Sequence, residues 1–100
     1  MIIKSWNNWS GKLKRGDIVA VHARRWFDKI NGNTYHSCRV LVNGLEIGRD
    51  NFAYGYGDHY KQTASEILGG ALEYPLTLQA RERGILLDID VVDVTRKKDL

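Results

Sequence analysis

Arginine and aromatic side chains recur at alternate positions in the first half of the chain, a spacing that places them on one face of a β-sheet. Arg24 and Trp26 lie two residues apart, and Tyr35 and Arg39 follow in the next extended segment. An arginine guanidinium matches a phosphate in a bidentate geometry, and aromatic rings offer flat surfaces to bases. The pattern therefore indicates binding of a phosphate-bearing ligand.

A second candidate is the glycine-rich turn at residues 54–61, where a period-two pattern ends and a helical one begins. Helix N-termini attract anions, but the glycines also suit a simple strand-to-helix turn, and Asp58, a good N-cap, already places a carboxylate there. We expect the turn to form the rim of the site rather than its floor. The ligand-binding candidates here are Tyr54, Tyr56, His59 and Lys61, with His36 from an earlier strand.

Groups for catalysis or metal binding do not converge in the sequence. There is no Ser/His/Asp motif, phosphate-binding P-loop or HExxH motif, and Cys38 has no second cysteine to pair with. Asp58 and His59 would make an acid–base pair, but Asp58 serves as the cap, and the helix dipole disfavours protonated His59. We expect a protein that is not an enzyme, with no metal and no cofactor.

The composition is that of one soluble globular domain spanning residues 1–100. Apolar residues make up 43% and charged residues 27% of the 100 residues, and the net charge of +3 is a mild basic bias. Residues 1–16 form a lead-in whose Trp6 and Trp9 cover the core or contact a partner, and residues 95–100 form a frayed tail. Without a signal peptide or membrane span, we expect a cytoplasmic location and no membrane partner.

Three extended segments, at residues 17–27, 34–42 and 45–54, are separated by Asn31-Gly32 and Asn43-Gly44. Asn-Gly between extended runs predicts two-residue hairpin turns, and hence a three-stranded meander. With such turns the facing pairs would be Val42 with Leu45, Val40 with Ile47, Ala23 with Val40, Val21 with Val42, and Phe27 with His36.

This register sorts the side chains onto two faces of the sheet. The apolar face carries Val21, Ala23, Phe27, Cys38, Val40, Val42, Leu45 and Ile47, whereas the open face carries His22, Arg24, Trp26, Tyr35, Ser37, Arg39 and Leu41. The register also puts Arg24 opposite Arg39, and a bound anion or a partner carboxylate would relieve the repulsion between them.

A helix beginning at Asp58 places apolar residues up to Leu72 at helical spacing, so it would cover the apolar face. Gly69-Gly70 implies a close backbone approach or an early helix end. A short second helix is expected at residues 76–83, and a last strand at residues 85–94 with a bulge near Val91. The predicted fold is α+β: a four-stranded, mainly antiparallel sheet, made of the meander and a C-terminal strand, with one main helix packed on one face.

The order of three meander strands and a helix resembles the later two-thirds of a double-stranded-RNA-binding domain. The resemblance rests on His36, Val40, Val42, Gly44, Gly55, Gly57, Lys61, Ala71 and Leu72. It implies that lysines at the helix N-terminus contact phosphates, but Tyr60 replaces the first such lysine, so only Lys61 carries over. The leading helix of that domain also has no counterpart in residues 1–16.

A second resemblance, over about residues 23–68, is to a group of small hypothetical proteins encoded by bacteriophages. It rests on residues 24–27 (Arg-Arg-Trp-Phe), 32–37 (Gly-Asn-Thr-Tyr-His-Ser) and 54–58 (Tyr-Gly-Tyr-Gly-Asp). It implies a setting in the host bacterial cytosol, where small phage proteins bind and block host components, including nucleotide signals of host defence.

Together the residues and the resemblance predict a non-catalytic, phage-type protein that captures a nucleotide signal or a nucleic acid, plausibly to counter host defence. The alternative is an inhibitor that binds a host protein, or an assembly subunit, with the same basic and aromatic face as its interface. Tyr, Trp and Arg are enriched in protein interfaces, so a homo-oligomer is also compatible with this face.

Overall fold

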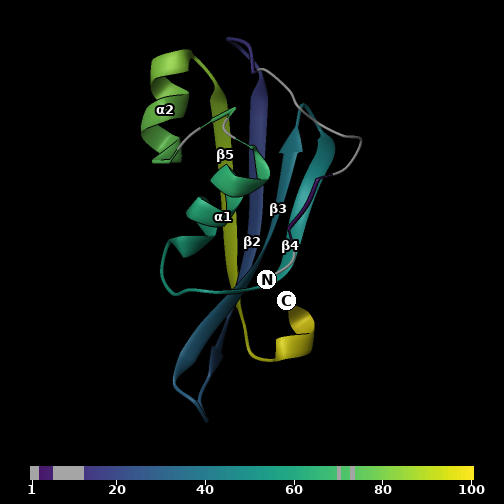
Figure 1. Ribbon diagram of the computed structural model, residues 1–100, viewed down its shortest axis with the longest axis vertical. Helices are drawn as coiled ribbons and strands as arrows, with labels where there is room; N and C mark the ends of the chain where they lie inside the picture. The colour runs from purple at the N-terminus through teal and green to yellow at the C-terminus, as the bar shows by residue number, and fades with distance from the viewer. Residues whose placement is uncertain (1–2, 6–12, 70, 73) are drawn as a thin grey trace.

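The structure, a computed structural model, describes the backbone of residues 3–5 and all of residues 13–69, 71–72 and 74–100. In this part of the chain a five-stranded sheet is covered on one face by two helices (Figure 1). The elements are β1 (Ile3–Ser5), β2 (Ile18–Asp28), β3 (Asn33–Val42), β4 (Leu45–Tyr54), α1 (His59–Ile67), α2 (Leu76–Arg83), β5 (Leu86–Val94) and the 3-10 helix η1 (Lys97–Asp99).

The predicted α+β fold, with a meander and a C-terminal strand, is confirmed. The strand order is β1-β4-β3-β2-β5, and every neighbouring pair is antiparallel except β2 and β5, which are parallel. Strand β1 lies in the segment expected as a lead-in, and adds a strand beyond the four predicted. The predictions for Trp6 and Trp9 fall outside the described residues.

Strand β5 pairs with β2 without interruption, from Ile18 opposite Leu86 to Trp26 opposite Val94. The bulge predicted near Val91 is therefore wrong. Val92 lies on the same face of the sheet as Asp90, because side chains two residues apart on a strand share a face. Its side chain is 49% exposed, so the apparent break in the pattern is a valine on the open face and not an extra residue.

The first hairpin turns through four residues rather than two, because Asp28 pairs directly with Asn33. The Asp28 carboxylate accepts hydrogen bonds from the backbone N–H groups of Ile30 and Asn31 and from the Asn31 side chain. Among the described non-glycine residues only Asn43 has a positive φ, so Asn31 does not adopt the left-handed conformation that a two-residue turn requires.

The longer turn shifts the pairing of β2 with β3 by two residues. Val21 faces Val40 and Phe27 faces Thr34, so the predicted pairs of Val21 with Val42, Ala23 with Val40 and Phe27 with His36 are wrong. Arg24 faces Ser37 and not Arg39. Because a shift by two residues preserves side-chain direction, the assignment to faces survives the change of partners.

The second hairpin has the predicted two-residue turn. Val42 faces Leu45, and Asn43 and Gly44 have φ values of 50° and 86°. Beyond it, β4 departs from regular pairing twice, because Val40 faces Gly48 where Ile47 was predicted, and His36 faces Ala53 while Cys38 faces Asp50. Each irregularity adds a residue to β4 and changes which side chains of that strand reach the open face.

Helix α1 packs against the apolar face and contacts β3, β4 and β2. It ends at Ile67, earlier than the predicted face up to Leu72, and Gly69 follows with a φ of +61°. Leu68 and Leu72 remain buried beyond the helix end. Helix α2 occupies the predicted residues and ends at Gly84 in the left-handed conformation.

The core lies between the sheet and the two helices. Its buried members from the strands and helices include Val19, Val21, Ala23, Cys38, Val40, Ile47, Tyr60, Ala64, Ile67, Leu76 and Ala80. Phe27 and Leu45, both predicted for this surface, are 53% and 57% exposed, because they lie toward opposite ends of the sheet, Phe27 near the end of β2 and Leu45 at the start of β4. The opposite face of the sheet, called here the open face, is covered only in part by η1 among the described segments (Figure 1).

Candidate functional site: the open face of the sheet

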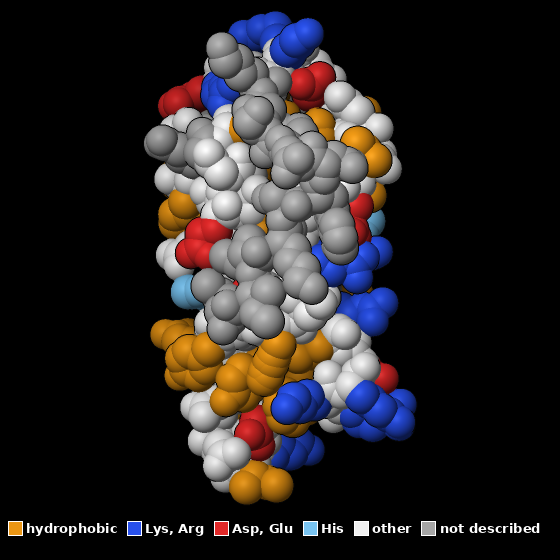
Figure 2. All heavy atoms as spheres, turned by 45° about the vertical axis from the view of Figure 1, so that its right-hand side comes forward, with side chains coloured by type: hydrophobic (Ala, Val, Ile, Leu, Met, Phe, Trp, Pro, Cys, Tyr) orange, Lys and Arg blue, Asp and Glu red, His pale blue; other side chains and the backbone are white. Residues whose placement is uncertain are grey.

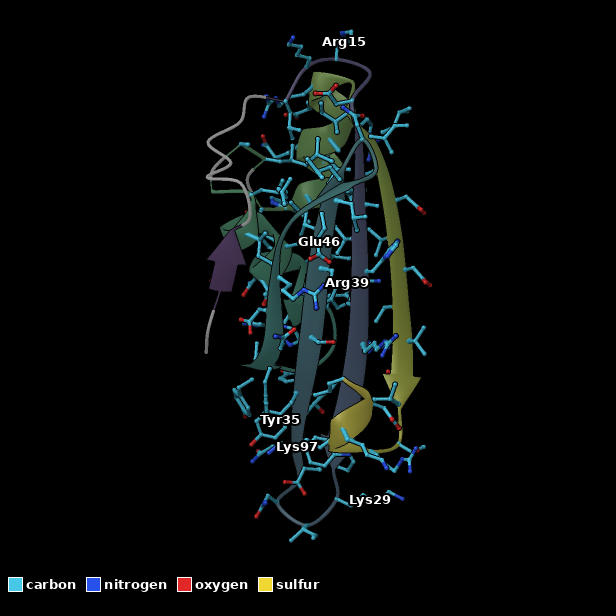
Figure 3. All side chains as sticks on the ribbon, turned by 90° about the vertical axis from the view of Figure 1, so that its right-hand side faces the viewer. Arg15, Lys29, Tyr35, Arg39, Glu46 and Lys97 are labelled. Carbon is cyan, nitrogen blue, oxygen red and sulfur yellow. The ribbon has the colours of Figure 1, made fainter. Side chains whose placement is uncertain are left out.

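Three arginines from three neighbouring strands line one hollow on the open face. Arg24 comes from β2, Arg39 from β3 and Arg49 from β4. The hollow has a volume of about 300 Å³, and His22, Ser37, Asn51, Asp90 and Leu100 also line it. We call it the arginine hollow, and Figure 3 shows Arg39 near the middle of the sheet.

Two of these arginines, Arg39 and Arg49, contact one carboxylate, that of Glu46. Glu46 Oε1 lies 2.8 Å from Arg49 Nη2, and its second oxygen accepts hydrogen bonds from Nε and Nη2 of the same residue. Arg39 Nη1 lies 3.7 Å from Glu46 Oε1 and its side chain is 48% exposed. Glu46 therefore interacts more closely with Arg49, and the guanidinium of Arg39 still has N–H donors that face the hollow.

The bulge in β4 explains why Arg49 faces this way. With regular pairing from the Asn43-Gly44 turn, Arg49 would stand opposite Cys38 and point into the core. The extra residue at Ile47 reverses the alternation, so Arg49 stands opposite Arg39 and Asp50 takes the place opposite Cys38. The sequence analysis missed Arg49 for this reason, although Gly48 inside the strand is a signal that favours a bulge.

The C-terminal segment contacts the same face. Arg24 Nη1 donates a 2.9 Å hydrogen bond to the backbone oxygen of Asp99, and Lys97 Nζ lies 4.9 Å from the centre of the Phe52 ring. Residues 97–99, expected as a frayed tail, therefore form η1 against the sheet (Figure 3). A second hollow of about 440 Å³ lies there, lined by Asn51, Phe52, Lys97, Lys98 and Leu100.

Aromatic rings gather beside these hollows. Trp26 and Tyr35 stack with ring centres 5.8 Å apart, and Tyr35 meets Phe52 and Tyr54 edge-on at 4.6 and 5.7 Å. Figure 2 shows hydrophobic side chains gathered in the lower half of the molecule, with lysine and arginine side chains next to them. The structure thus brings together Arg24, Trp26, Tyr35, Arg39 and Tyr54, all predicted as ligand-binding residues.

The other predicted site residues lie elsewhere. His36 is 1% exposed and lies under α1, where its Nε2 is 2.7 Å from Thr63 Oγ1 and its Nδ1 is 3.3 Å from the oxygen of Gly55. Because that oxygen can only accept, Nδ1 carries the proton and Nε2 accepts the Thr63 hydroxyl. Burial lowers the pKa of His36 from its usual value. This His–Thr pair is enclosed in the core, away from the open face.

The turn at residues 54–61 builds a separate hollow of about 380 Å³, lined by Tyr54, Tyr56, His59 and Tyr74 among others. Asp58 occupies the predicted N-cap position of α1, but its side chain makes no capping hydrogen bond. Its carboxylate lies instead 3.6 Å from Nζ of Lys61, the third residue of α1. Lys61, the cation expected to contact phosphates, is thus paired within the turn.

Reactive groups are buried on the helix side of the sheet. The Cys38 thiol is fully buried and donates to the Tyr60 oxygen, and burial raises its pKa to about 12. Asp50 is 1% exposed, its Oδ1 accepts the Phe52 N–H, and burial raises its pKa. Within the described ranges, His, Cys, Asp and Glu form no group of three that could hold a metal ion.

Among the described segments, no helix is long and apolar enough to cross a membrane. Comparisons with protein-family models, with curated proteins and with solved structures found no match to this chain.

Proposed function

We propose that the protein is a non-catalytic binding protein that captures a phosphate-bearing ligand, a nucleotide or a nucleic acid, on the open face of its sheet. The observation that carries this proposal is the direct cross-strand pairing of Arg39 with Arg49 in a hollow that Arg24 also lines. Like charges directly opposite each other on a sheet destabilise the pair, and the one carboxylate that contacts both, Glu46, lies closer to Arg49, so their placement together favours a further anion at Arg39.

The chemistry of the hollow fits a phosphate. Guanidinium groups bind phosphate oxygens through parallel N–H donors, and three of them converge from neighbouring strands. Glu46 and Asp90 offset part of the positive charge, so the hollow favours a ligand that makes directed hydrogen bonds over one held by net charge alone. The burial of Cys38 and of the His36–Thr63 pair supports a binding role in preference to catalysis.

The biological setting that we propose with this activity comes from the resemblance to small bacteriophage proteins. Capture of a nucleotide signal in the host bacterial cytosol would counter a host defence that depends on that signal. This setting is separate from the chemistry of the face, and a ligand recovered from bacterial cytosol tests it directly.

The test is to purify the protein and its Arg39→Glu variant, measure their mass by size exclusion with light scattering, and identify co-purifying compounds by mass spectrometry. Arg81→Glu, on α2 in the helix layer, is the control with the same change of charge. We expect Arg39→Glu to lose the ligand at unchanged mass, Arg81→Glu to retain it, and binding to weaken as salt is added. A wild-type protein without ligand and without salt-dependent binding of nucleotides, DNA or RNA would refute the proposal.

A second candidate function is a protein-binding inhibitor or an assembly subunit that uses this face as its interface. It is favoured by exposed apolar side chains at the end of the sheet that carries the aromatic cluster: Tyr54, a member of the cluster, is 62% exposed, and Ile30, in the β2–β3 turn, is 93% exposed. In this case Arg39→Glu would dissociate an oligomer or a complex instead of releasing a small ligand. Light scattering separates the two outcomes, because only this candidate predicts a change of mass.

A further inference from the structure

The open face carries two parallel rows of side chains that cross the same three strands. One row, here the aromatic row, consists of Trp26, Tyr35 and Tyr54, which are cross-strand partners on β2, β3 and β4. The other, here the cationic row, consists of Arg39 and Arg49, with His22 as the cross-strand partner of Arg39 on β2.

The two rows are separated along the strands. Tyr35 and Arg39 lie four residues apart on β3, which corresponds to roughly 13 Å at the rise of an antiparallel strand. Two hollows adjoin between the rows, because Asn51 and Leu100 line both the arginine hollow and the hollow beside Phe52. Lys97 and Lys98 line the second hollow, so cations continue from the cationic row toward the aromatic row.

We infer that the ligand of this face is a single-stranded nucleic acid, with bases stacked against the aromatic row and the phosphate backbone following the arginines and lysines. This inference rests on the proposed function and specifies its ligand. Sheets that present aromatic rings beside a basic groove bind single strands in this way, because every base has a face that can stack on a ring.

The number of rings and cations on this face separates this ligand from two others. A mononucleotide offers one base to the three rings of the aromatic row, whereas a strand of several nucleotides can stack several bases there and place several phosphates near the cations. The bases of a duplex are already stacked on each other, and their faces are closed to Trp26, Tyr35 and Tyr54. The face therefore favours a single strand over a mononucleotide and over a duplex.

Segment η1 lies between the rows and sets the path of the strand. Asp99 accepts the hydrogen bond of Arg24, and Lys97 covers one side of the Phe52 ring. The more exposed ring is Tyr54, at the β4 end of the aromatic row and 62% exposed. A base stacked there leaves η1 in place, with Lys97 and Lys98 beside the strand.

The experiment measures fluorescence anisotropy of labelled oligo(dT) and oligo(U) of increasing length at low salt, with a mononucleotide and a duplex of matched length as competitors. Tyr54→Leu removes an exposed ring from the row, Tyr54→Phe keeps the ring, and Phe27→Leu removes a ring of similar exposure from the helix side of the sheet. We expect affinity to rise with length, Tyr54→Leu to weaken binding at least fivefold, and the other two variants to change it less than twofold.

The two proposals fail in different ways. If the mononucleotide or the duplex competes as well as the single strand, or Tyr54→Leu binds like the wild type, the single-strand inference is wrong. The proposed function survives that result if Arg39→Glu still abolishes binding of the mononucleotide. If Arg39→Glu retains full affinity for every probe, the arginine hollow is not the site and both proposals fail.

Discussion

Arg39 and Arg49 stand directly opposite each other on the open face, and Glu46 contacts both, at 3.7 Å from Arg39 and 2.8 Å from Arg49. One carboxylate thus serves two guanidinium groups, and its closer partner is Arg49. Glu46 has two effects that oppose each other: it stabilises a sheet that places like charges together, and it competes with any anion that approaches the arginines.

Replacing Glu46 with Gln separates these effects. The neutral amide no longer offsets the arginines, so we expect anion affinity to rise roughly three- to tenfold, or about 0.7 to 1.4 kcal/mol. The free energy of unfolding should fall by about 0.5 to 1 kcal/mol, because a partly exposed ion pair is lost. Titration of an oligonucleotide and urea denaturation measure the two quantities.

Glu82→Gln, on α2 in the helix layer, makes the same change of charge away from the open face and serves as the control. It should alter both quantities much less. An affinity that falls in Glu46→Gln and stays constant in Glu82→Gln would contradict an anion site at Arg39, and would mean that Glu46 itself contacts the ligand.

A second prediction concerns the turn between β4 and α1, which requires glycine at two positions for different structural reasons. Gly57 has a φ of +60° with open space around it, whereas a Cβ at Gly55, with a φ of +150°, would overlap the His59 ring. We expect Gly57→Ala to cost about 1 kcal/mol of unfolding free energy. Gly55→Ala combines backbone strain with the overlap and should cost roughly 3 kcal/mol.

The double variant Gly55→Ala/His59→Ala tests the cause, because it removes the ring that the new methyl group meets. It should recover part of the stability that Gly55→Ala loses, as measured by thermal or urea unfolding. Equal losses in the two single alanine variants would show that packing on His59 contributes nothing to the requirement for glycine.

The faces of the sheet could be predicted from the sequence, but the partners across the strands could not. Alternation in β2 and β3 assigns Val21 and Val40 to one side and Arg39 to the other whatever the register. The register itself depends on the Asp28 carboxylate, whose hydrogen bonds to Ile30 and Asn31 stabilise a longer turn. Such local hydrogen bonds compete with the turn that Asn-Gly favours.

For the same reason, only some residues of the candidate site could be predicted from the sequence. Arg24, Trp26, Tyr35 and Arg39 lie in regular stretches of their strands, and alternation alone brings them to one face. Arg49 follows a bulge that reverses alternation within β4, and the pairing that reveals it is a contact between strands. Alternation along β3 places His36 on the helix side of the sheet. There it is buried under α1 and packs in the core, away from the candidate site.

A third prediction is a pH dependence of stability that comes from His36. Burial lowers its pKa in the folded state, so the unfolded state binds more protons between that lowered pKa and the usual value of about 6.5. The stability is therefore fully present above about pH 6.5 and is lost as the pH falls through the lowered pKa. Asp50 acts in the opposite sense: its raised pKa reduces stability as the pH rises above about 3.9.

His36→Gln removes the first contribution. It should lower stability at neutral pH, because Gln reproduces the contacts with Thr63 and Gly55 incompletely, but it should also flatten the rise in unfolding free energy as the pH rises from the lowered pKa of His36 to about 6.5. His22→Gln, on the open face, is the matched control. Urea denaturation across this range gives the slopes, and an unchanged slope in His36→Gln would exclude His36 as the titrating group.

A fourth prediction uses the single cysteine of the chain as a probe of the layer between α1 and the sheet. Cys38 is enclosed by that layer and its pKa is raised to about 12, so at pH 8 about one thiol in ten thousand is ionised. We expect iodoacetamide to leave the folded protein unlabelled over hours and to label it within minutes in concentrated guanidinium. Mass spectrometry counts the adducts.

The same measurement reports how α1 opens. Gly55→Ala strains the turn that leads into α1, so it should raise the labelling rate of Cys38 more than Gly57→Ala does, in proportion to the loss of stability if labelling follows unfolding. Prompt labelling of the folded wild type would mean that α1 leaves the sheet without unfolding of the domain. In that case the labelling rate would not scale with the loss of unfolding free energy in the glycine variants, and the core between Cys38 and Tyr60 would be open on the timescale of the reaction.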